Sequence, residues 1–312
     1  MNFGLTEDQA SILAGLDQLI AAQAPAAPTA PDFVASAPAL ETAVAEAGYL
    51  DVAREEGFGP LEAALVVERL ARLPHAMEAA ASALVAPALG IERGVRPIAM
   101  VQGDMMRPAR FLTTAQALLV DRGDAAVMLR LSSADAAPVE ALLAYPYGRL
   151  NKADFELAPI DVHTLRRRWR IALAVEAAGC MAAGLTQVVE HVTNRRAFGR
   201  PLGSLQAIQH RLAMAAETAE AAKWLAFRAA WSDSDADAAL AAAFAQMWIA
   251  QITYDLQQFS GAMGLTLEFP LHYWTYRLRA LAGELGGASV QTRAAAAATW
   301  PDVSARLDLA GA

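Results

Sequence analysis

A glycine-rich turn flanked by arginines carries the clearest chemical signal in the sequence. Residues 195–209 read RRAFGRPLGSLQAIQ and join the end of one expected helix to the start of the next. An arginine there can contact a phosphate through two hydrogen bonds, and free N–H groups at a helix N-terminus add a second anion-binding element. The segment therefore predicts a diphosphate site. In the alternative interpretation, Arg195, Arg196 and Arg200 only offset the helix dipole and stay solvated.

Residues 258–270, which read QFSGAMGLTLEFP, form a second candidate binding loop. Glycines let a backbone approach a cofactor closely, whereas the methyl group of Ala262 narrows that approach. The alternative is that Gly261 to Gly264 only break a helix.

The cysteine, three of the histidines and a basic run are weaker indications of a functional site. Cys180 stands in an apolar stretch and is expected to be a small core residue. His191, His210 and His272 lack metal-like spacing, so no metal site is expected. The basic run at 166–170 fits a contact with the phosphate of an anionic ligand, a solvated helix start or an interface with an acidic partner.

Composition limits the classes of function and location. The chain has 312 residues, 55% of them hydrophobic, and a net charge of -8, which argues against a nucleic-acid partner because phosphate recognition needs a basic surface. An uninterrupted apolar run of about 18 residues is absent, so no membrane span is predicted. With one cysteine and no basic, apolar leader, we expect a cytoplasmic protein.

The two loops must be positioned by long helices. Apolar residues recur with helical period in alanine-rich segments, while short apolar runs between turn signals at 97–160 favour strands. The expected helices lie at 5–20, 40–50, 61–73 and 75–89, and the expected strands at 111–120, 125–131 and 141–145. From 163 onward we expect four or five helices in a bundle. We divide the chain into an N-terminal helical domain (1–95), a small middle β domain (96–161) and a C-terminal helical bundle (162–312).

Both loops resemble motifs of acyl-CoA dehydrogenases. Residues 195–206 match every fixed position of Arg-x-x-Phe-Gly-x-Pro-Leu-x-x-x-Gln, and residues 258–270 resemble Gln-x-x-Gly-Gly-x-Gly-(Phe/Tyr)-Thr-x-Glu-x-Pro, with Ala262 in place of the second glycine. Residues 3–9 and 47–72 are similar to the family's opening and N-terminal helices. The resemblance implies a mainly α fold with N-terminal helices, a reduced middle β-barrel and a C-terminal four-helix bundle.

The resemblance also implies a cofactor and a reaction. Members of the family bind FAD and remove hydrogen from the α and β carbons of an acyl-CoA thioester. Their arginine and glutamine motifs reach across a subunit interface to the adenosine diphosphate end of FAD. Carried over by position, the cofactor-binding candidates are Arg195, Phe198, Gln206, Gln258 and Gly261.

The family's catalytic base has no counterpart at either of its usual positions. If Arg293 is aligned with the arginine that follows the base, the glutamate position falls on Gly286. The alternative position on an earlier helix falls on Trp169. Glu284 is the reserve candidate, whereas Glu176 is expected to be a satisfied or solvated acid. The family's Thr-x-x-x-Thr-(Glu/Asp)-Pro and Gly-Ser-(Asp/Asn) signature, which lines the flavin ring and the acyl chain, is also not found in the middle domain. Residues 111–115 resemble only a remnant of a later strand of the family, Trp/Ile-x-(Thr/Ser)-Asn/Gly-Ala.

This pattern resembles a shortened subunit of the heteromeric α2β2 acyl-CoA dehydrogenases of bacterial steroid and bile-acid degradation. The resemblance implies a homologous partner that supplies the glutamate and the acyl pocket, and electron-transfer flavoprotein as a further partner. Two alternatives stay open: a self-sufficient homo-oligomer that uses Glu284, and a flavin-free structural or regulatory pseudoenzyme.

Overall fold

The N-terminal part of the chain is a layer of helices. A computed structural model describes residues 4–25, 33–197 and 199–302. Thr6 begins the first helix with a capping box, in which its side chain accepts a hydrogen bond from the Gln9 N–H and its own N–H donates to the Gln9 side chain. The elements of this layer are α1 (Glu7–Gln23), α2 (Pro38–Glu46), the 3₁₀ helix η1 (Tyr49–Arg54), α3 (Pro60–Ala71) and the π-helical turn η2 (Ala81–Val85).

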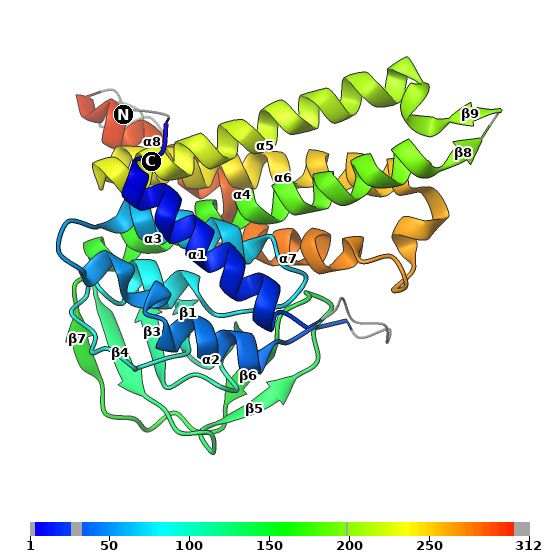
Figure 1. Cartoon of the computed structure of the whole chain (residues 1–312). Helices are drawn as coiled ribbons and strands as arrows, with labels where there is room; N and C mark the ends of the chain where they lie inside the picture. Colours follow the sequence, from blue (N-terminus) through cyan, green and yellow to red (C-terminus); the bar gives the residue numbers. More distant parts are fainter. Residues whose placement is uncertain (1–3, 26–32, 198, 303–312) are drawn as a thin grey trace.

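The middle part forms two small sheets on one side of the molecule, below the helices in Figure 1. One sheet has the order β1-β3-β4-β7, with β1 and β3 parallel and the remaining pairs antiparallel. The other has the antiparallel order β2-β6-β5. The strands are β1 (Ile98–Gln102), β2 (Ala109–Arg110), β3 (Ala117–Asp121), β4 (Ala126–Arg130), β5 (Ala136–Val139), β6 (Tyr147–Leu150) and β7 (Ala158–Ile160).

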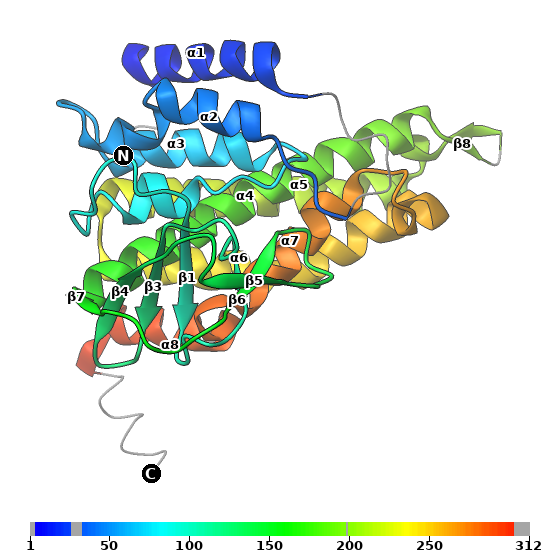
Figure 2. The same cartoon turned by 90° about the horizontal axis from the view of Figure 1, so that it is seen from below.

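Long helices make up the rest of the described chain. In Figure 1, α4, α5 and α6 run side by side, and the short hairpin β8–β9 projects from one end of this bundle. Helices α7 and α8 both pack against α6. In Figure 2, α1 and α2 lie at the top of the molecule, and β3, β4 and β7 lie in its lower half. The elements are α4 (Val162–Asn194), β8 (Arg196–Ala197), β9 (Arg200–Pro201), η3 (Leu202–Ser204), α5 (Gln206–Ser232), α6 (Asp235–Ser260), η4 (Gly261–Leu265), α7 (Leu271–Gly283), η5 (Glu284–Gly286) and α8 (Gly287–Thr299).

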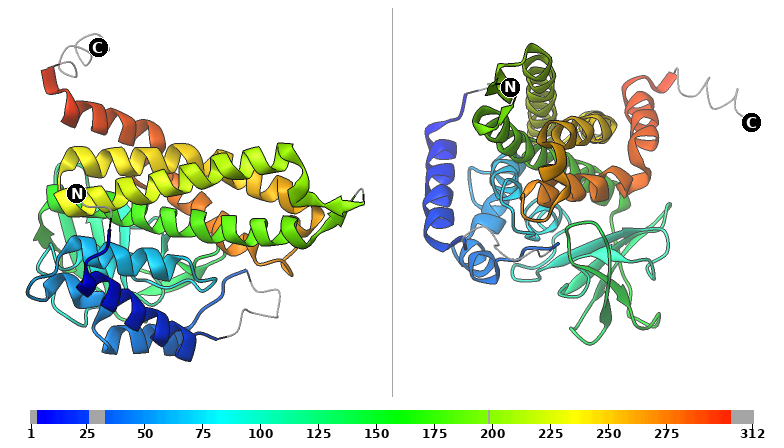
Figure 3. Two further views of the ribbon diagram at one scale, coloured as in Figure 1. Left: turned by 45° about the horizontal axis from the view of Figure 1, so that its top comes forward. Right: turned by 90° about the vertical axis from the view of Figure 1, so that its right-hand side faces the viewer.

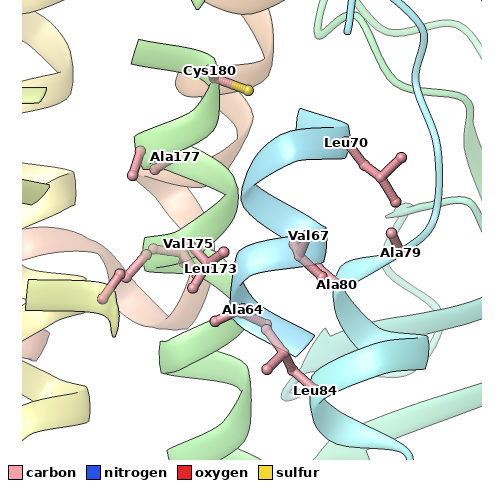
Figure 4. Close-up of a cluster of buried hydrophobic side chains, with 14 of the residues drawn as sticks. Ala64, Val67, Leu70, Ala79, Ala80, Leu84, Leu173, Val175, Ala177 and Cys180 are labelled. Atoms are coloured by element: carbon pink, nitrogen blue, oxygen red, sulfur yellow. The ribbon is translucent and has the colours of Figure 1, made fainter. Parts of the chain in front are cut away.

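Helix α4 is the centre of the molecule, packed between the N-terminal helices and the other bundle helices (Figure 3). Figure 4 shows Leu173, Val175 and Cys180 among the buried side chains where α4 meets α3 and η2. By length and composition α4 could cross a membrane, but 78% of its apolar window is buried inside the molecule, as in a core helix. Small residues let α4 and α3 approach closely: a Cβ at Gly179 would lie 2.5 Å from the Glu68 carbonyl oxygen.

The mainly α fold with a small β part is confirmed, but several predicted element bounds were wrong. His75 forms a bridge with Ala35, residues 76–79 have no regular secondary structure, and η2 is the named element within the predicted helix at 75–89. The predicted strand at 111–120 shrinks to β3, because Phe111 has a positive φ of 63° and begins a turn. Instead of a strand at 141–145, β5 and β6 flank this segment. Pro138 is tolerated in β5 because β5 is an edge strand.

Candidate functional site

The first candidate site is a cavity at the end of the bundle, which we call the hairpin cavity. Its volume is about 420 Å³, and it brings together Arg195, Gln258 and Gly261, three of the five residues predicted from the sequence. Its other lining residues are His191, Leu202, Leu205, Ile208, Phe259, Ser260, Ala262 and Met263. The hairpin cavity therefore combines a mainly apolar wall with an arginine and an exposed amide.

Two helix ends position these side chains. Helix α4 stops at Asn194, and the chain turns back through β8 and β9 before α5 begins. Helix α6 ends at Ser260 and continues into η4 after Gly261, whose φ is 59°. Residues on either side of the hairpin, Arg195 and Leu202, thus line one cavity together with Gly261 to Met263 of the η4 turn.

The electrostatics of the hairpin cavity are set by Arg195. No ion pair of Arg195 occurs within residues 4–25, 33–197 and 199–302. Burial and the neighbouring Arg195 lower the pKa of His191, which keeps its imidazole neutral near pH 7. A guanidinium without a carboxylate partner, beside a neutral ring, suits an anionic ligand.

The two remaining cofactor candidates lie outside this lining. Gln206 begins α5, between the lining residues Leu205 and Ile208, but does not itself line the hairpin cavity. Phe198 lies outside the described residues.

A second cavity, the junction cavity, lies where the sheets meet the bundle, with a volume of about 470 Å³. All three residues considered for the base, Trp169, Glu284 and Gly286, line it together. The other lining residues are Met100, Val101, Gln102, Arg107, Pro108, Ala109, Arg110, Leu143, Tyr147, Arg279, Ala280, Gly283 and Leu285.

Both carboxylate oxygens of Glu284 already accept hydrogen bonds. Arg110 Nε donates to Oε1 over 2.7 Å, and the Trp169 indole donates to Oε2, also over 2.7 Å. These two contacts fix the orientation of the Glu284 carboxylate against Arg110 and Trp169. Glu284 lies in the turn η5 between α7 and α8.

The backbone at Gly286 is built for glycine. Its φ is 80°, a left-handed conformation that side chains with a Cβ rarely adopt. A Cβ there would also lie 2.7 Å from Val290 Cγ2. A glutamate at position 286 would therefore require both the backbone and Val290 to shift.

Behind Glu284, buried charges join the sheets to the bundle. Arg110, on β2, also donates to Glu176 on α4 over 2.7 Å, and the Tyr145 hydroxyl donates to Glu176 over 2.7 Å. Burial alone would lower the pKa of Arg110, but Glu176 and Glu284 outweigh it and raise this pKa well above its usual value. Burial, followed by the nearby Glu284, raises the pKa of Tyr147 to about 12, so its hydroxyl stays protonated.

The expectation of a satisfied acid at Glu176 fits these contacts, whereas its partner Arg110 was missed by sequence reasoning. One signal was available. A single charge stands in each of two apolar stretches, Arg110 ahead of residues 111–112 and Glu176 within 171–181. Because a buried charge needs a partner, the two could have been paired.

The arginine run at 166–170 is neither solvated nor free for coenzyme A. Arg166 pairs with Asp121, which is fully buried, and Arg167 and Arg168 both pair with Asp233. Arg170 donates to the Gln291 side chain. These contacts fix the start of α4 to β3 and to the α5–α6 turn.

The other sequence candidates are structural. Cys180 is buried, and burial raises the pKa of its thiol to about 12. Tyr273 and Trp274, two neighbouring aromatic residues of α7, belong to the core. Across the described ranges, no group of three or more His, Cys, Asp or Glu side chains could hold a metal ion.

The bundle matches a known protein family. Residues 165–299 match the family described as "Acyl-CoA dehydrogenase, C-terminal domain". The short-chain specific acyl-CoA dehydrogenase of Bos taurus is 38% identical over 116 residues, which are 35% of this chain and 28% of the bovine protein. FadE34 of Mycobacterium tuberculosis is 34% identical over 142 residues, or 43% of this chain and 20% of that protein. The matched part thus spans about a quarter of these relatives.

Solved structures share the fold over nearly the whole chain. A variant of the Tcur3481–Tcur3483 steroid ACAD has a TM-score of 0.77 and 20% identity, covering 96% of this chain and 99% of that chain. The ChsE4–ChsE5 complex from Mycobacterium tuberculosis has a TM-score of 0.74 and 20% identity, covering 94% and 97%. Butyryl-CoA dehydrogenase from Megasphaera elsdenii has a TM-score of 0.73 and 18% identity, covering 96% and 100%.

N-terminal helices, two small sheets and a helical bundle define the acyl-CoA dehydrogenase fold class. Residues 165–299 match the acyl-CoA dehydrogenase C-terminal domain family, and the described chain as a whole has the acyl-CoA dehydrogenase fold.

Proposed function

We propose that this chain is one subunit of an FAD-dependent acyl-CoA dehydrogenase that removes hydrogen from the α and β carbons of an acyl-CoA thioester. In this proposal the chain contributes contacts to the adenosine diphosphate end of FAD, and a homologous partner subunit supplies the catalytic glutamate. The observation that carries the proposal is the pair of cavities: one retains the cofactor motif, and the other has glycine at the base position.

The residues of the hairpin cavity fit the adenosine diphosphate group. Arg195 offers a guanidinium for a phosphate, and Gln258 offers an amide to a ribose or purine. Leu202, Leu205 and Ile208 give an apolar wall for a purine face. When bound, FAD supplies the hydride acceptor, while this chain's part is to orient its nucleotide end.

Two observations support placing the base on a partner subunit. Gly286 has a left-handed backbone that disfavours any side chain. Glu284 has both oxygens engaged by Arg110 and Trp169. Glu284 would have to share or exchange these contacts to reach a substrate, which weighs against a self-sufficient enzyme that uses Glu284.

The surface of α6 supports a helical partner. Leu240, Met247 and Tyr254 recur every seven residues and are 42%, 57% and 60% exposed. Phe244 and Trp248 lie half-buried between them. An apolar stripe with this spacing lies along one face of a helix and is typical of helix packing between subunits. We call these five residues the α6 stripe.

The similar folds of the Tcur3481–Tcur3483 steroid ACAD and the ChsE4–ChsE5 complex favour a heteromer of α2β2 type, with a steroid-derived acyl group as the substrate class. Electron-transfer flavoprotein is the electron acceptor that this proposal implies. A cytoplasmic location completes the proposal.

Co-expression with a glutamate-bearing homologue tests the proposal. We expect a yellow complex whose visible spectrum shows bound flavin. Arg195→Ala should lower the flavin content by about tenfold, because it removes a charge-assisted contact to the diphosphate. Arg149→Ala removes an exposed arginine on β6 and serves as the matched control. A colourless wild-type complex would contradict the proposal.

A further inference from the structure

The imidazole ring of His75 is buried without a hydrogen-bond partner. His75 is 3% exposed, and neither Nδ1 nor Nε2 has a partner within residues 4–25, 33–197 and 199–302. A neutral imidazole can donate through one nitrogen and accept through the other, and buried polar side chains usually find such partners. The ring of His75 therefore does not serve the fold as a hydrogen-bonding group, and its presence here needs another explanation.

The backbone at His75 joins two segments of the N-terminal layer. His75 forms a parallel bridge with Ala35, and the Ala76 N–H donates to the Ala35 carbonyl over 2.7 Å. Ala76 and Val34 pack in a small core cluster that also contains Tyr145 of the β part. The bridge thus holds the chain after α3 against the chain before α2, and covers this small core cluster.

A buried arginine of α7 holds the same place from the other side. Arg277 is 2% exposed, and its guanidinium donates to the carbonyl oxygens of Leu73, at 2.8 Å, and Pro74. Among the described residues Arg277 forms no ion pair. Burial, followed by the charge of Arg277, lowers the pKa of His75 below its usual 6.5. A proton on His75 would place a second buried cation beside the first.

The other ionisable groups around the bridge are engaged elsewhere. Residues 33–37 carry no ionisable side chain. Glu78, on the chain after α3, accepts hydrogen bonds from its own segment and from the first residue of β1. The Tyr145 hydroxyl donates to Glu176, and His272 on α7 contacts a backbone carbonyl oxygen. None of these groups is hydrogen-bonded to the His75 ring, so no carboxylate shares a proton placed on it.

We propose that His75 is a pH-sensitive switch that joins the N-terminal layer to α7. While the imidazole is neutral, the chain after α3 stays paired with Ala35 and stays bound to the Arg277 guanidinium. When the ring takes a proton, repulsion from Arg277 and the demand of the imidazolium for water separate this chain from Ala35 and expose the small core cluster. The switch requires neither flavin nor the proposed dehydrogenation, so the two proposals fail separately.

Acid opens this switch because the folded state binds the proton less readily than the unfolded state does. The pKa of His75 is lowered in the folded protein. The stability that the neutral ring allows is therefore fully present above pH 6.5 and is lost as the pH falls toward the pKa of the folded state.

Hydrogen exchange of the full-length chain at about pH 7.5 and about pH 5 tests the switch against His75→Phe, whose ring cannot take a proton. Both proteins carry Glu41→Gln, because Glu41, with a pKa of about 7, titrates in the same range. At the lower pH, peptides covering residues 33–37 and 73–79 should exchange at least about tenfold faster in the protein that keeps His75 than in His75→Phe. At the higher pH the two should agree. His210→Phe, an exposed change on α5, is the matched control and should leave the pH response unchanged.

Nuclear magnetic resonance of the histidine rings gives a second measurement, which uses the chain without a change at residue 75. The His75 signal should titrate below pH 6.5. Circular dichroism checks that each variant is folded, and His75→Leu replaces the phenylalanine variant if that one is not. A His75 ring that titrates at or above pH 6.5 would overturn the proposal. So would equal exchange at the lower pH in the chain with His75 and in its folded apolar variant.

Discussion

At the scale of single residues, Glu41 shows how burial sets a protonation state. It lies in the first turn of α2, half-buried and near Glu78. Burial, followed by repulsion from Glu78, raises its pKa from 4.5 to about 7. The folded state therefore holds this proton more tightly than the unfolded state does. The associated stability is fully present below pH 4.5 and is lost as the pH rises through about 7.

Glu41→Gln should remove this pH dependence, because glutamine stays neutral. We expect the variant to be about 1–2 kcal/mol more stable than the wild type at pH 8, less than the full pKa shift implies because the side chain keeps solvent contact. At pH 4 the two should differ little. Urea unfolding at both values measures this. Glu46→Gln, an exposed change on the same helix, is the control, and a difference independent of pH would contradict the argument.

Whether a site can be predicted from the sequence depends on how far apart along the chain its contacting residues lie. The motifs at 195–209 and 258–270 predicted one site, and the hairpin cavity brings Arg195, Gln258 and Gly261 together. The network of Arg110, Glu176 and Glu284 was not predicted. Arg110 and Glu284 are 174 residues apart in sequence and meet only through the packing of β2 against the bundle. No local pattern encodes such a contact.

At the scale of elements, helices were predicted better than strands. Helices α4, α5 and α6 are long enough for the helical period of their apolar residues to be recognised in the sequence. Short strands such as β5 and β6 depend on their neighbours, and the turn at Phe111 depends on a hydrogen bond from its N–H to the Pro146 carbonyl. The predicted helix at 75–89 failed at its start because His75 forms a bridge with Ala35 and the Ala76 N–H donates to the Ala35 carbonyl.

The close contact of α4 with α3 gives a prediction at this scale. Gly179→Ala should cost about 2–3 kcal/mol of unfolding free energy, although alanine favours a helix, because the new methyl meets the Glu68 carbonyl and the Ala71 methyl. Gly184→Ala is the matched control in the same helix. Its nearest neighbour, the end of the Leu256 side chain, can move. Chemical denaturation measures the unfolding free energy of both variants, and Gly179→Ala should lose more of it than Gly184→Ala. An equal loss, or a larger loss in Gly184→Ala, would contradict this packing.

At the scale of the whole molecule, the α6 stripe should hold the partner subunit. The Met247→Glu, Tyr254→Glu double variant places two charges on this surface and should lose co-purification with the homologue while keeping its helical content. Leu142→Glu is the control, since Leu142 is 70% exposed in the β part of the molecule. Undiminished co-purification of the double variant would place the interface elsewhere.

The division of labour between two subunits is tested most directly by flavin reduction in the assembled complex. Substrate acyl-CoA is added without oxygen, and the loss of visible flavin absorbance is followed in two complexes. One carries Glu284→Gln in this chain, and the other carries glutamine at the catalytic glutamate of the partner. We expect the first complex to bleach at a rate near that of the wild type and the second to bleach at least about a hundredfold more slowly. Rapid bleaching of the partner variant, with loss of bleaching in a flavin-loaded Glu284→Gln complex, would contradict the account and assign the base to this chain.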